Sequence, residues 1–148
     1  MTNNQIIALI LGFGFFSFIL LLLLYGLTAL CYQKIFKAYG YAHPGYAWIP
    51  FYRLYILADL TCDSTFKFAD FEIEKKIFVW WWIIAYVIAY VPFVGGIVSF
   101  ILNIICLGFC YDEGIKKLDP TYDSKVLSYV STVFPIVFWF VVLPKKVD

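Results

Sequence analysis

Three long stretches of this 148-residue chain lack charged side chains, although the whole sequence contains 11 basic and 10 acidic residues. The charge-free stretches are Met1–Gln33, Ile77–Tyr111 and Val126–Pro144. A charged side chain at the centre of a bilayer costs at least about 2.5–3.5 kcal/mol. These stretches contain no charged residue, and hydrophobic residues make up 64% of the whole chain. The sequence therefore predicts an integral membrane protein.

The chain also lacks the features of several functional classes. Its net charge of only +1 argues against the basic surface on which nucleic-acid binding depends. It has one histidine and four widely separated cysteines, and it contains no zinc-protease, P-loop or dinucleotide-binding motif. We therefore expect no metal, no cofactor and no catalytic residues, and the sequence argues against an enzyme.

The lengths of the charge-free stretches predict about four transmembrane helices in a single polytopic membrane domain over residues 1–148. The first stretch contains an apolar run of 25 residues, more than the roughly 20 that a helix needs to cross the hydrocarbon core. The second stretch has 35 residues, too many for one crossing, and Pro92 divides it into a hairpin. The predicted fold is an all-α integral membrane protein with transmembrane helices at 6–30, 77–91, 93–111 and 126–143.

An interfacial or re-entrant helix is expected at 48–60, between the first and second charge-free stretches. Pro50, Arg53 and Asp59 interrupt this apolar segment, which is too short between its charges to cross a bilayer. Pro50 suits the first position of such a helix, because that position needs no backbone N–H donor.

Aromatic and basic side chains flank the apolar stretches and are expected to anchor them at the membrane surface. Aromatic residues make up 22% of the chain, and Tyr and Trp favour the membrane boundary, where the ring is buried and the polar atom stays hydrated. Before the second stretch, Glu72 is expected to pair with Lys76 one helical turn later. The expected membrane anchors are Trp48, Lys75, Lys76, Trp80, Trp81 and Trp82.

The distribution of Lys and Arg predicts the orientation of the chain. Nine of the 11 basic residues lie in the two loops before and after the predicted hairpin, which share one side of the membrane. These loops are expected in the cytoplasm, and the N-terminus is expected outside. Lys145 and Lys146 then fall outside, against the rule, and a last segment that re-enters the membrane instead of crossing it would remove this conflict.

Five polar residues are candidates for contact with a partner, a lipid or a substrate. Ser99 and Asn103 share a helix face, where they either form interhelical hydrogen bonds or line a polar path. Arg53 and Asp59 lie on the predicted interfacial helix and either contact lipid head groups or form a salt bridge. His43 lies in a turn at the membrane surface, where a histidine can also sense pH.

Several short motifs resemble one bacterial family. The motifs are Lys34-Ile35-Phe36-Lys37-Ala38, Pro44-Gly45-Tyr46-Ala47, Ile49-Pro50-Phe51-Tyr52 and Leu54-Tyr55. Together they resemble the DUF5684-type family of small polytopic membrane proteins of unknown function, over about residues 32–115. Arg53 and Gly95 stand where that family tends to have asparagine. The resemblance implies a helical protein of the bacterial cytoplasmic membrane, and it implies no established chemistry.

These observations favour a small membrane protein that acts as a structural or accessory subunit, or as an assembly partner of another membrane protein or of itself. The alternative is a small transporter or channel component, because apolar segments broken by proline can mark transport sites. A membrane-embedded enzyme has the least support, since the chain lacks a set of convergent titratable groups. The expected partners are the lipid bilayer and a membrane protein, and not nucleic acid.

Overall fold

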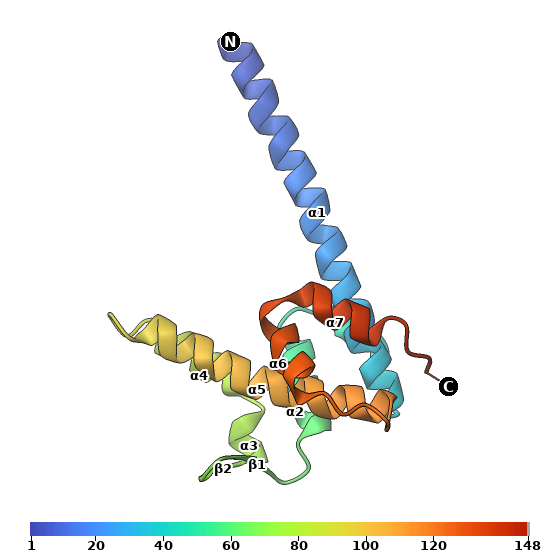
Figure 1. Ribbon diagram of the computed structural model, residues 1–148. Coiled ribbons are helices and arrows are strands. Elements are labelled where there is room, and N and C mark those ends of the chain that lie inside the picture. The colour runs from blue at the N-terminus through green and yellow to red at the C-terminus, as the bar shows by residue number, and fades with distance from the viewer. Residues whose placement is uncertain (148) are drawn as a thin grey trace.

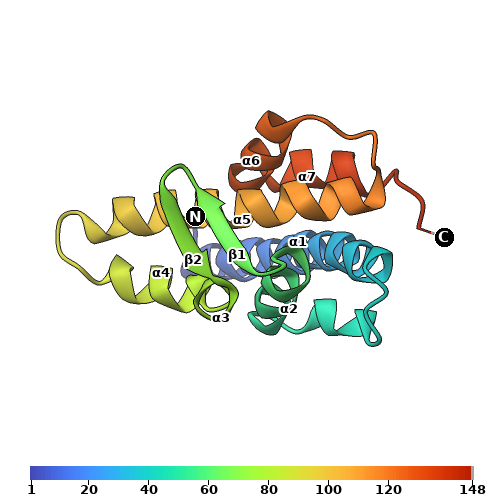
Figure 2. The same ribbon diagram turned by 90° about the horizontal axis from the view of Figure 1, so that it is seen from below.

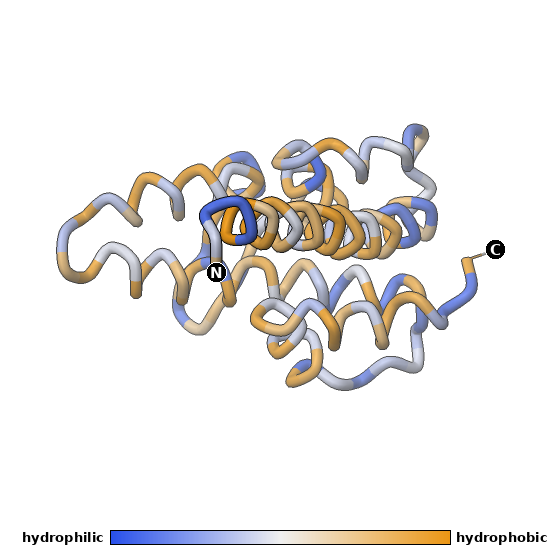
Figure 3. Tube along the Cα trace, turned by 90° about the horizontal axis from the view of Figure 1, so that it is seen from above, coloured by the Kyte–Doolittle hydropathy of each residue, from blue (hydrophilic) through white to orange (hydrophobic). Residues whose placement is uncertain are grey.

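The long first helix dominates the computed structural model, which describes residues 1–147. Figure 1 shows α1 leaving a group of shorter helices steeply, while the hairpin of α4 and α5 runs sideways. Figure 3, seen from above and coloured by hydropathy, shows that α1 is mostly hydrophobic beyond the polar residues at its N-terminus. The elements are α1 (Asn3–Ala38), η1 (Pro44–Trp48), α2 (Tyr52–Thr61), β1 (Thr65–Phe68), β2 (Phe71–Glu74), α3 (Lys75–Phe78), α4 (Trp81–Ala89), α5 (Gly95–Leu118), α6 (Lys125–Val133) and α7 (Pro135–Val142).

The two halves of α1 lie in different surroundings. From Ile6 to Leu23 almost every side chain is exposed, and all of them are uncharged. From Tyr25 onward the helix packs against the other elements, and Ile35 and Phe36 are fully buried. A helix that is apolar on all its faces needs a membrane or protein around it. Within residues 1–147, α1 and α5 are the two helices long and apolar enough to cross a membrane.

The core lies where the second half of α1 meets α2, α5 and α7, and aromatic rings fill its centre. The rings of Tyr111 and Phe138 stack with their centroids 4.0 Å apart, and the ring of Tyr32 lies 5.9 Å from that of Phe138. The hydroxyls of Tyr32 and Tyr111 share a hydrogen bond of 3.0 Å. Buried hydroxyls need such partners, so this pair fixes how α1 crosses α5.

Glycines let two neighbouring helices approach α5 closely. A Cβ at Gly108 would lie 2.4 Å from Cδ1 of Tyr129 on α6, and a Cβ at Gly114 would lie 3.0 Å from Cγ2 of Ile35 on α1. Only a residue without a side chain fits the first position. Gly108 therefore sets the distance between α5 and α6.

A two-stranded hairpin replaces the predicted helix start before the second charge-free stretch. β1 and β2 are antiparallel, with Lys67 opposite Glu72 and an ion pair of 2.6 Å between them. The predicted helical pair of Glu72 with Lys76 is therefore wrong, because Glu72 lies in a strand. Apolar and polar residues alternate along both strands, which is the period of a β-strand. Phe66 is buried against Phe78, with the ring centroids 4.6 Å apart.

Four transmembrane helices are not confirmed. The predicted helix at 126–143 divides at Pro135 into α6 and α7, of nine and eight residues. At about 1.5 Å per residue, each is far shorter than a hydrocarbon core of about 30 Å. The predicted helix at 77–91 divides into α3 and α4. The predicted hairpin itself is present, because α4 and α5 lie side by side and Pro92 is in the turn that joins them (Figure 2).

Of the predicted interfacial helix at 48–60, residues 52–60 are helical and belong to α2, whereas Trp48 is the last residue of η1. Proline stands at the start of η1, where Pro44 is the first residue. Pro50 does not open α2, because the helix begins at Tyr52, after Phe51 with a φ of 63°. The backbone therefore turns sharply between η1 and α2, and α2 packs against α1 and α5 in the core.

Candidate functional site

Three aromatic side chains lie on or beside α1 at the level where its exposed half ends. We call Tyr25, Trp48 and Trp139 the aromatic collar. The Trp48 ring lies 3.7 Å from the position that a Cβ on Gly26 would occupy, and the Tyr25 hydroxyl donates to the Trp48 carbonyl. Trp139 Nε1 donates to Thr28 Oγ1 at 3.1 Å. The collar therefore lies at the level where the exposed, uncharged half of α1 meets the packed elements.

Arg53 on α2 lies against this collar. Its guanidinium carbon is 4.7 Å from the centroid of the Tyr25 ring and 5.0 Å from that of Tyr32. Two such contacts hold the cation over aromatic faces. Its Nη1 atom is buried and has no hydrogen-bond partner within residues 1–147. Arg53 is therefore a cation beside the collar that forms no ion pair within the described residues.

Asp59 does not pair with Arg53. Its Oδ1 atom instead forms an ion pair with Lys75 Nζ, at a distance of 3.1 Å. Of the two alternatives expected for Arg53 and Asp59, the salt bridge between them is therefore not formed, and contact with lipid head groups stays a prediction. The ion pair with Asp59 ties Lys75, one of the predicted anchors, to α2, whereas Lys76 is exposed.

Several lysines have carboxylate partners, in contrast to Arg53. Lys116 contacts the buried Asp112 at 2.6 Å, and Ser128 on α6 donates to the other oxygen of that carboxylate at 3.2 Å. Lys145 contacts Asp119 at 2.5 Å. Among residues 1–147 no carboxylate forms an ion pair with Arg53.

Residues near the C-terminus contact the packed half of α1. Lys34 Nζ donates to the carbonyls of Leu143 and Lys145, the second at 2.8 Å. The hydrogen bond from Lys145 lowers the pKa of Asp119 to about 2. These contacts bring Lys145 to the same end of the molecule as Lys34.

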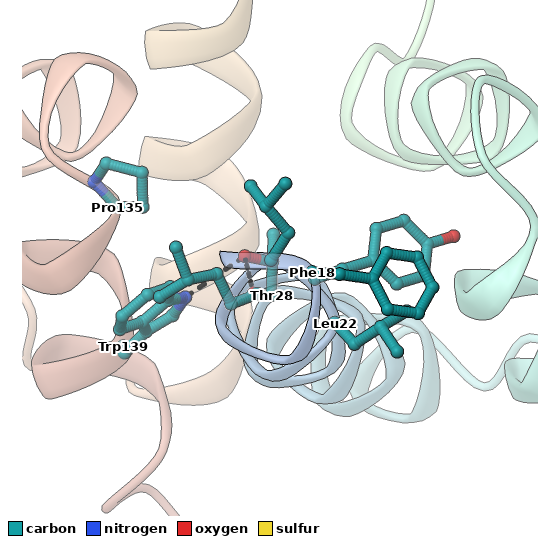
Figure 4. A pocket seen from close by; sticks show the side chains of 8 residues that line it. Phe18, Leu22, Thr28, Pro135 and Trp139 are labelled. Atoms are coloured by element: carbon teal, nitrogen blue, oxygen red, sulfur yellow. Dashed lines mark hydrogen bonds between the residues drawn. The ribbon is translucent and has the colours of Figure 1, made fainter. Parts of the chain in front are cut away.

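An apolar groove, the collar groove, runs along α1 away from the collar. Its volume is about 490 Å³. Figure 4 shows Trp139 and Pro135 of α7 on one side of α1, with Phe18 and Leu22 on α1 itself. No charged residue lines it. The lining residues are Phe18, Leu21, Leu22, Leu24, Tyr25, Thr28, Pro135 and Trp139.

A second groove, the hairpin groove, lies between α2, α4 and α5 and has a volume of about 520 Å³. Ser99 and Asn103 both line it, as expected for residues on one helix face. Asn103 Nδ2 donates to the Ser99 carbonyl at 2.8 Å, a bond within α5. The lining residues are Phe51, Leu54, Trp82, Ile83, Tyr86, Ala89, Ser99 and Asn103.

The three consecutive tryptophans differ in their exposure. Trp80 is half exposed, but Trp81 is only 4% exposed and belongs to the core. Trp81 therefore packs against the protein itself, and its role as a membrane anchor stays a prediction. The indole nitrogens of Trp81 and Trp82 are buried without hydrogen-bond partners in the described part of the chain. Trp80 lies in the turn before α4, whereas Trp81 is the first residue of that helix.

His43 and the cysteines lie apart from the collar. His43 is exposed just before η1, with its ring centroid 5.2 Å from that of Tyr46. All four cysteines are buried and free. Burial raises the pKa of the Cys62 thiol, which makes it a poor nucleophile. In residues 1–147 no group of three His, Cys, Asp or Glu side chains could hold a metal ion.

Comparison with family models, curated proteins and solved structures found no match for this chain. The resemblance to the DUF5684-type family therefore stays a prediction. Sequence reasoning identified Arg53 and Trp48 but missed Tyr25 and Trp139. Tyr25 has a visible signal, because it is the first tyrosine after a long run of aliphatic and Phe residues.

Proposed function

We propose that this protein is a small integral membrane subunit that works by assembly with another membrane protein or with a second copy of itself. In this proposal, the exposed half of α1 crosses the bilayer with its N-terminus outside. The collar lies at the inner boundary, and the packed helices lie on the cytoplasmic side. The return of Lys145 to the end of α1 that carries Lys34 supports this orientation, because basic residues then gather on one side.

One observation carries the proposal: the molecule has two apolar arms that point in different directions. The first arm is the exposed half of α1. The second is the hairpin of α4 and α5, where Tyr86, Phe93 and Ile97 are each more than 60% exposed. No side chain in Ile77–Tyr111 is charged. Both arms need an apolar environment, because exposed apolar patches of this extent are typical of membrane or protein contact.

The divergence of the arms favours a protein partner for the hairpin. If α1 crosses the bilayer along its normal, the hairpin lies along the surface (Figure 1). A helix that lies in the interface needs a charged or polar face toward water. The hairpin has apolar side chains on both faces, so one face would remain in contact with water unless another protein covered it.

Photo-crosslinking tests this proposal in native membranes. A photoreactive phenylalanine analogue at Phe93, which is fully exposed at the tip of the hairpin, is expected to form an adduct with a second polypeptide. The matched control is the same analogue at Asp70, which is exposed in the turn between β1 and β2. A monomer that is crosslinked at neither position, and that purifies alone in mild detergent, would refute the assembly function.

A transporter or channel component is the alternative function, and the hairpin groove supports it. Ser99 and Asn103 place a small polar area in an otherwise apolar groove of about 520 Å³, a volume in the range of small-molecule sites. Such a groove suits an uncharged amphiphile better than an ion. Replacing Asn103 with Leu should then abolish uptake of the cargo into vesicles, whereas an assembly subunit would keep its partner.

A further inference from the structure

We propose that the aromatic collar binds one phospholipid, with its phosphodiester on Arg53 and one acyl chain in the collar groove. This inference rests on the proposed insertion of α1 in the membrane. It does not depend on whether a protein covers the hairpin.

The head-group end of the site is the guanidinium of Arg53. A guanidinium offers five N–H donors in a planar fork that matches a phosphate. No side-chain hydrogen bond or ion pair of Arg53 is found within residues 1–147, and its Nη1 is buried without a partner. A buried donor without an acceptor is costly. An anion with two acceptor oxygens would remove this cost.

The rings of Tyr25 and Tyr32 prepare this cation for an anion. They lie 4.7 Å and 5.0 Å from the guanidinium carbon, so that the side chain is already ordered. An ordered side chain loses less conformational entropy on binding. The lysine that would compete for an anion at α2, Lys75, is already paired with Asp59.

The acyl-chain end of the site is the collar groove. It begins at Thr28 and Tyr25 and extends along α1 to Phe18, seven residues from Tyr25 and so about 10 Å away. Its volume is about 490 Å³, and it is lined almost entirely by carbon atoms. Tyr25 belongs to both ends, because its ring lines the groove and also contacts Arg53.

The depth of the site favours a lipid over an acidic peptide. Tyr and Trp rings lie at the level of lipid head groups, so the collar puts Arg53 at the depth of the phosphates. The groove then leads toward the bilayer centre along the exposed half of α1. A phospholipid has its anion and its apolar chain in this same order.

Native mass spectrometry of the full-length protein tests the site. The protein is purified in a maltoside detergent and titrated with phosphatidylglycerol, with diacylglycerol, or with inorganic phosphate. One bound phosphatidylglycerol is expected, with at least tenfold weaker binding of the other two probes, because each lacks one half of the ligand. Equal binding of diacylglycerol, or retention of inorganic phosphate alone, would overturn the proposal.

Two charge variants test whether the binding of phosphatidylglycerol depends on Arg53 in particular or on basic residues in general. Arg53→Gln is expected to weaken binding of phosphatidylglycerol about tenfold or more, as the loss of a charged hydrogen bond does. Lys117→Gln is the matched control, because Lys117 also lies over one tyrosine ring, that of Tyr39 at 5.5 Å, but far along the chain from the groove. Equal losses in both variants would contradict the site.

Two groove variants test the acyl-chain end without disturbing the core. Leu21 lines the groove and is 63% exposed, whereas Leu23 is 60% exposed and does not line it. Leu21→Trp should weaken lipid binding, and Leu23→Trp should not, with equal thermal stability for both. If Arg53 instead crosslinks to an acidic side chain of a co-purifying protein, the lipid site is refuted while the assembly function stands.

Discussion

The contact between Gly108 and Tyr129 makes the packing of α6 on α5 testable by one methyl group. In Gly108→Ala the new Cβ would lie 2.4 Å from Cδ1 and 2.6 Å from Cε1 of the Tyr129 ring. An ordinary contact begins near 3.4 Å, so the ring must move by about 1 Å. Overpacking of this kind costs about 1–3 kcal/mol. The higher helix propensity of alanine offsets this loss of stability by about 0.5–1 kcal/mol.

Gly96→Ala is the matched control for that variant. It lies in the same helix, and a Cβ there would meet nothing within 4 Å, so only the helix-propensity gain applies. The free energy of unfolding, measured by SDS titration in mixed micelles, should therefore be about 1–3 kcal/mol lower for Gly108→Ala than for Gly96→Ala. In a Tyr129→Ala background this difference should vanish. Equal stability of the two single variants would show that α6 does not pack on α5.

Two further predictions concern the C-terminal segment and the thiols. The hydrogen bond from Lys145 lowers the pKa of Asp119 from 3.8 to about 2. The contribution of this contact to the free energy of unfolding is therefore complete above about pH 4 and is lost as the pH falls through 2. Asp119→Asn should remove this acid dependence, measured as the change in unfolding midpoint between pH 5 and pH 2; an unchanged dependence would contradict the contact. The four native cysteines are buried and should react with a maleimide only at the rate of unfolding, and fast labelling of the folded protein would contradict their burial.

The long apolar helices could be predicted because their apolar character depends on composition alone. Runs without charge are visible in the sequence, and they locate α1 and the hairpin of α4 and α5. Proline and glycine also mark the turn at Pro92 and the break at Pro135 correctly. These signals are local, since each depends on the backbone chemistry of one or two residues.

The direction of each helix could not be predicted from the same signals. The absence of charge from Val126–Pro144 is compatible with one helix that crosses the membrane. It is equally compatible with two short helices that lead back to the packed end of α1. The deciding contacts are non-local: Trp139 bonds to Thr28, and Lys34 bonds to the carbonyl of Lys145. These partners are 111 residues apart in each case.

The candidate site was only partly predictable for the same reason. Arg53 stands out in the sequence because it interrupts an apolar segment. The sequence does not show which side chains contact it, because Tyr25 and Tyr32 lie on another helix. The β-hairpin was missed because each strand has four residues, too few for the alternation to stand out beside the charges that suggested a helix start.

Labelling of the two chain ends tests whether the chain crosses the membrane once, through α1. Cysteines replace Thr2 and Lys146 one at a time, and intact cells are treated with a membrane-impermeant maleimide before and after permeabilisation. We expect Thr2→Cys to be labelled from outside and Lys146→Cys to be labelled only after permeabilisation, because α6 and α7 lead the chain back to the packed end of α1. Labelling of both positions from outside would mean that the chain crosses the membrane an even number of times, and it would contradict this account.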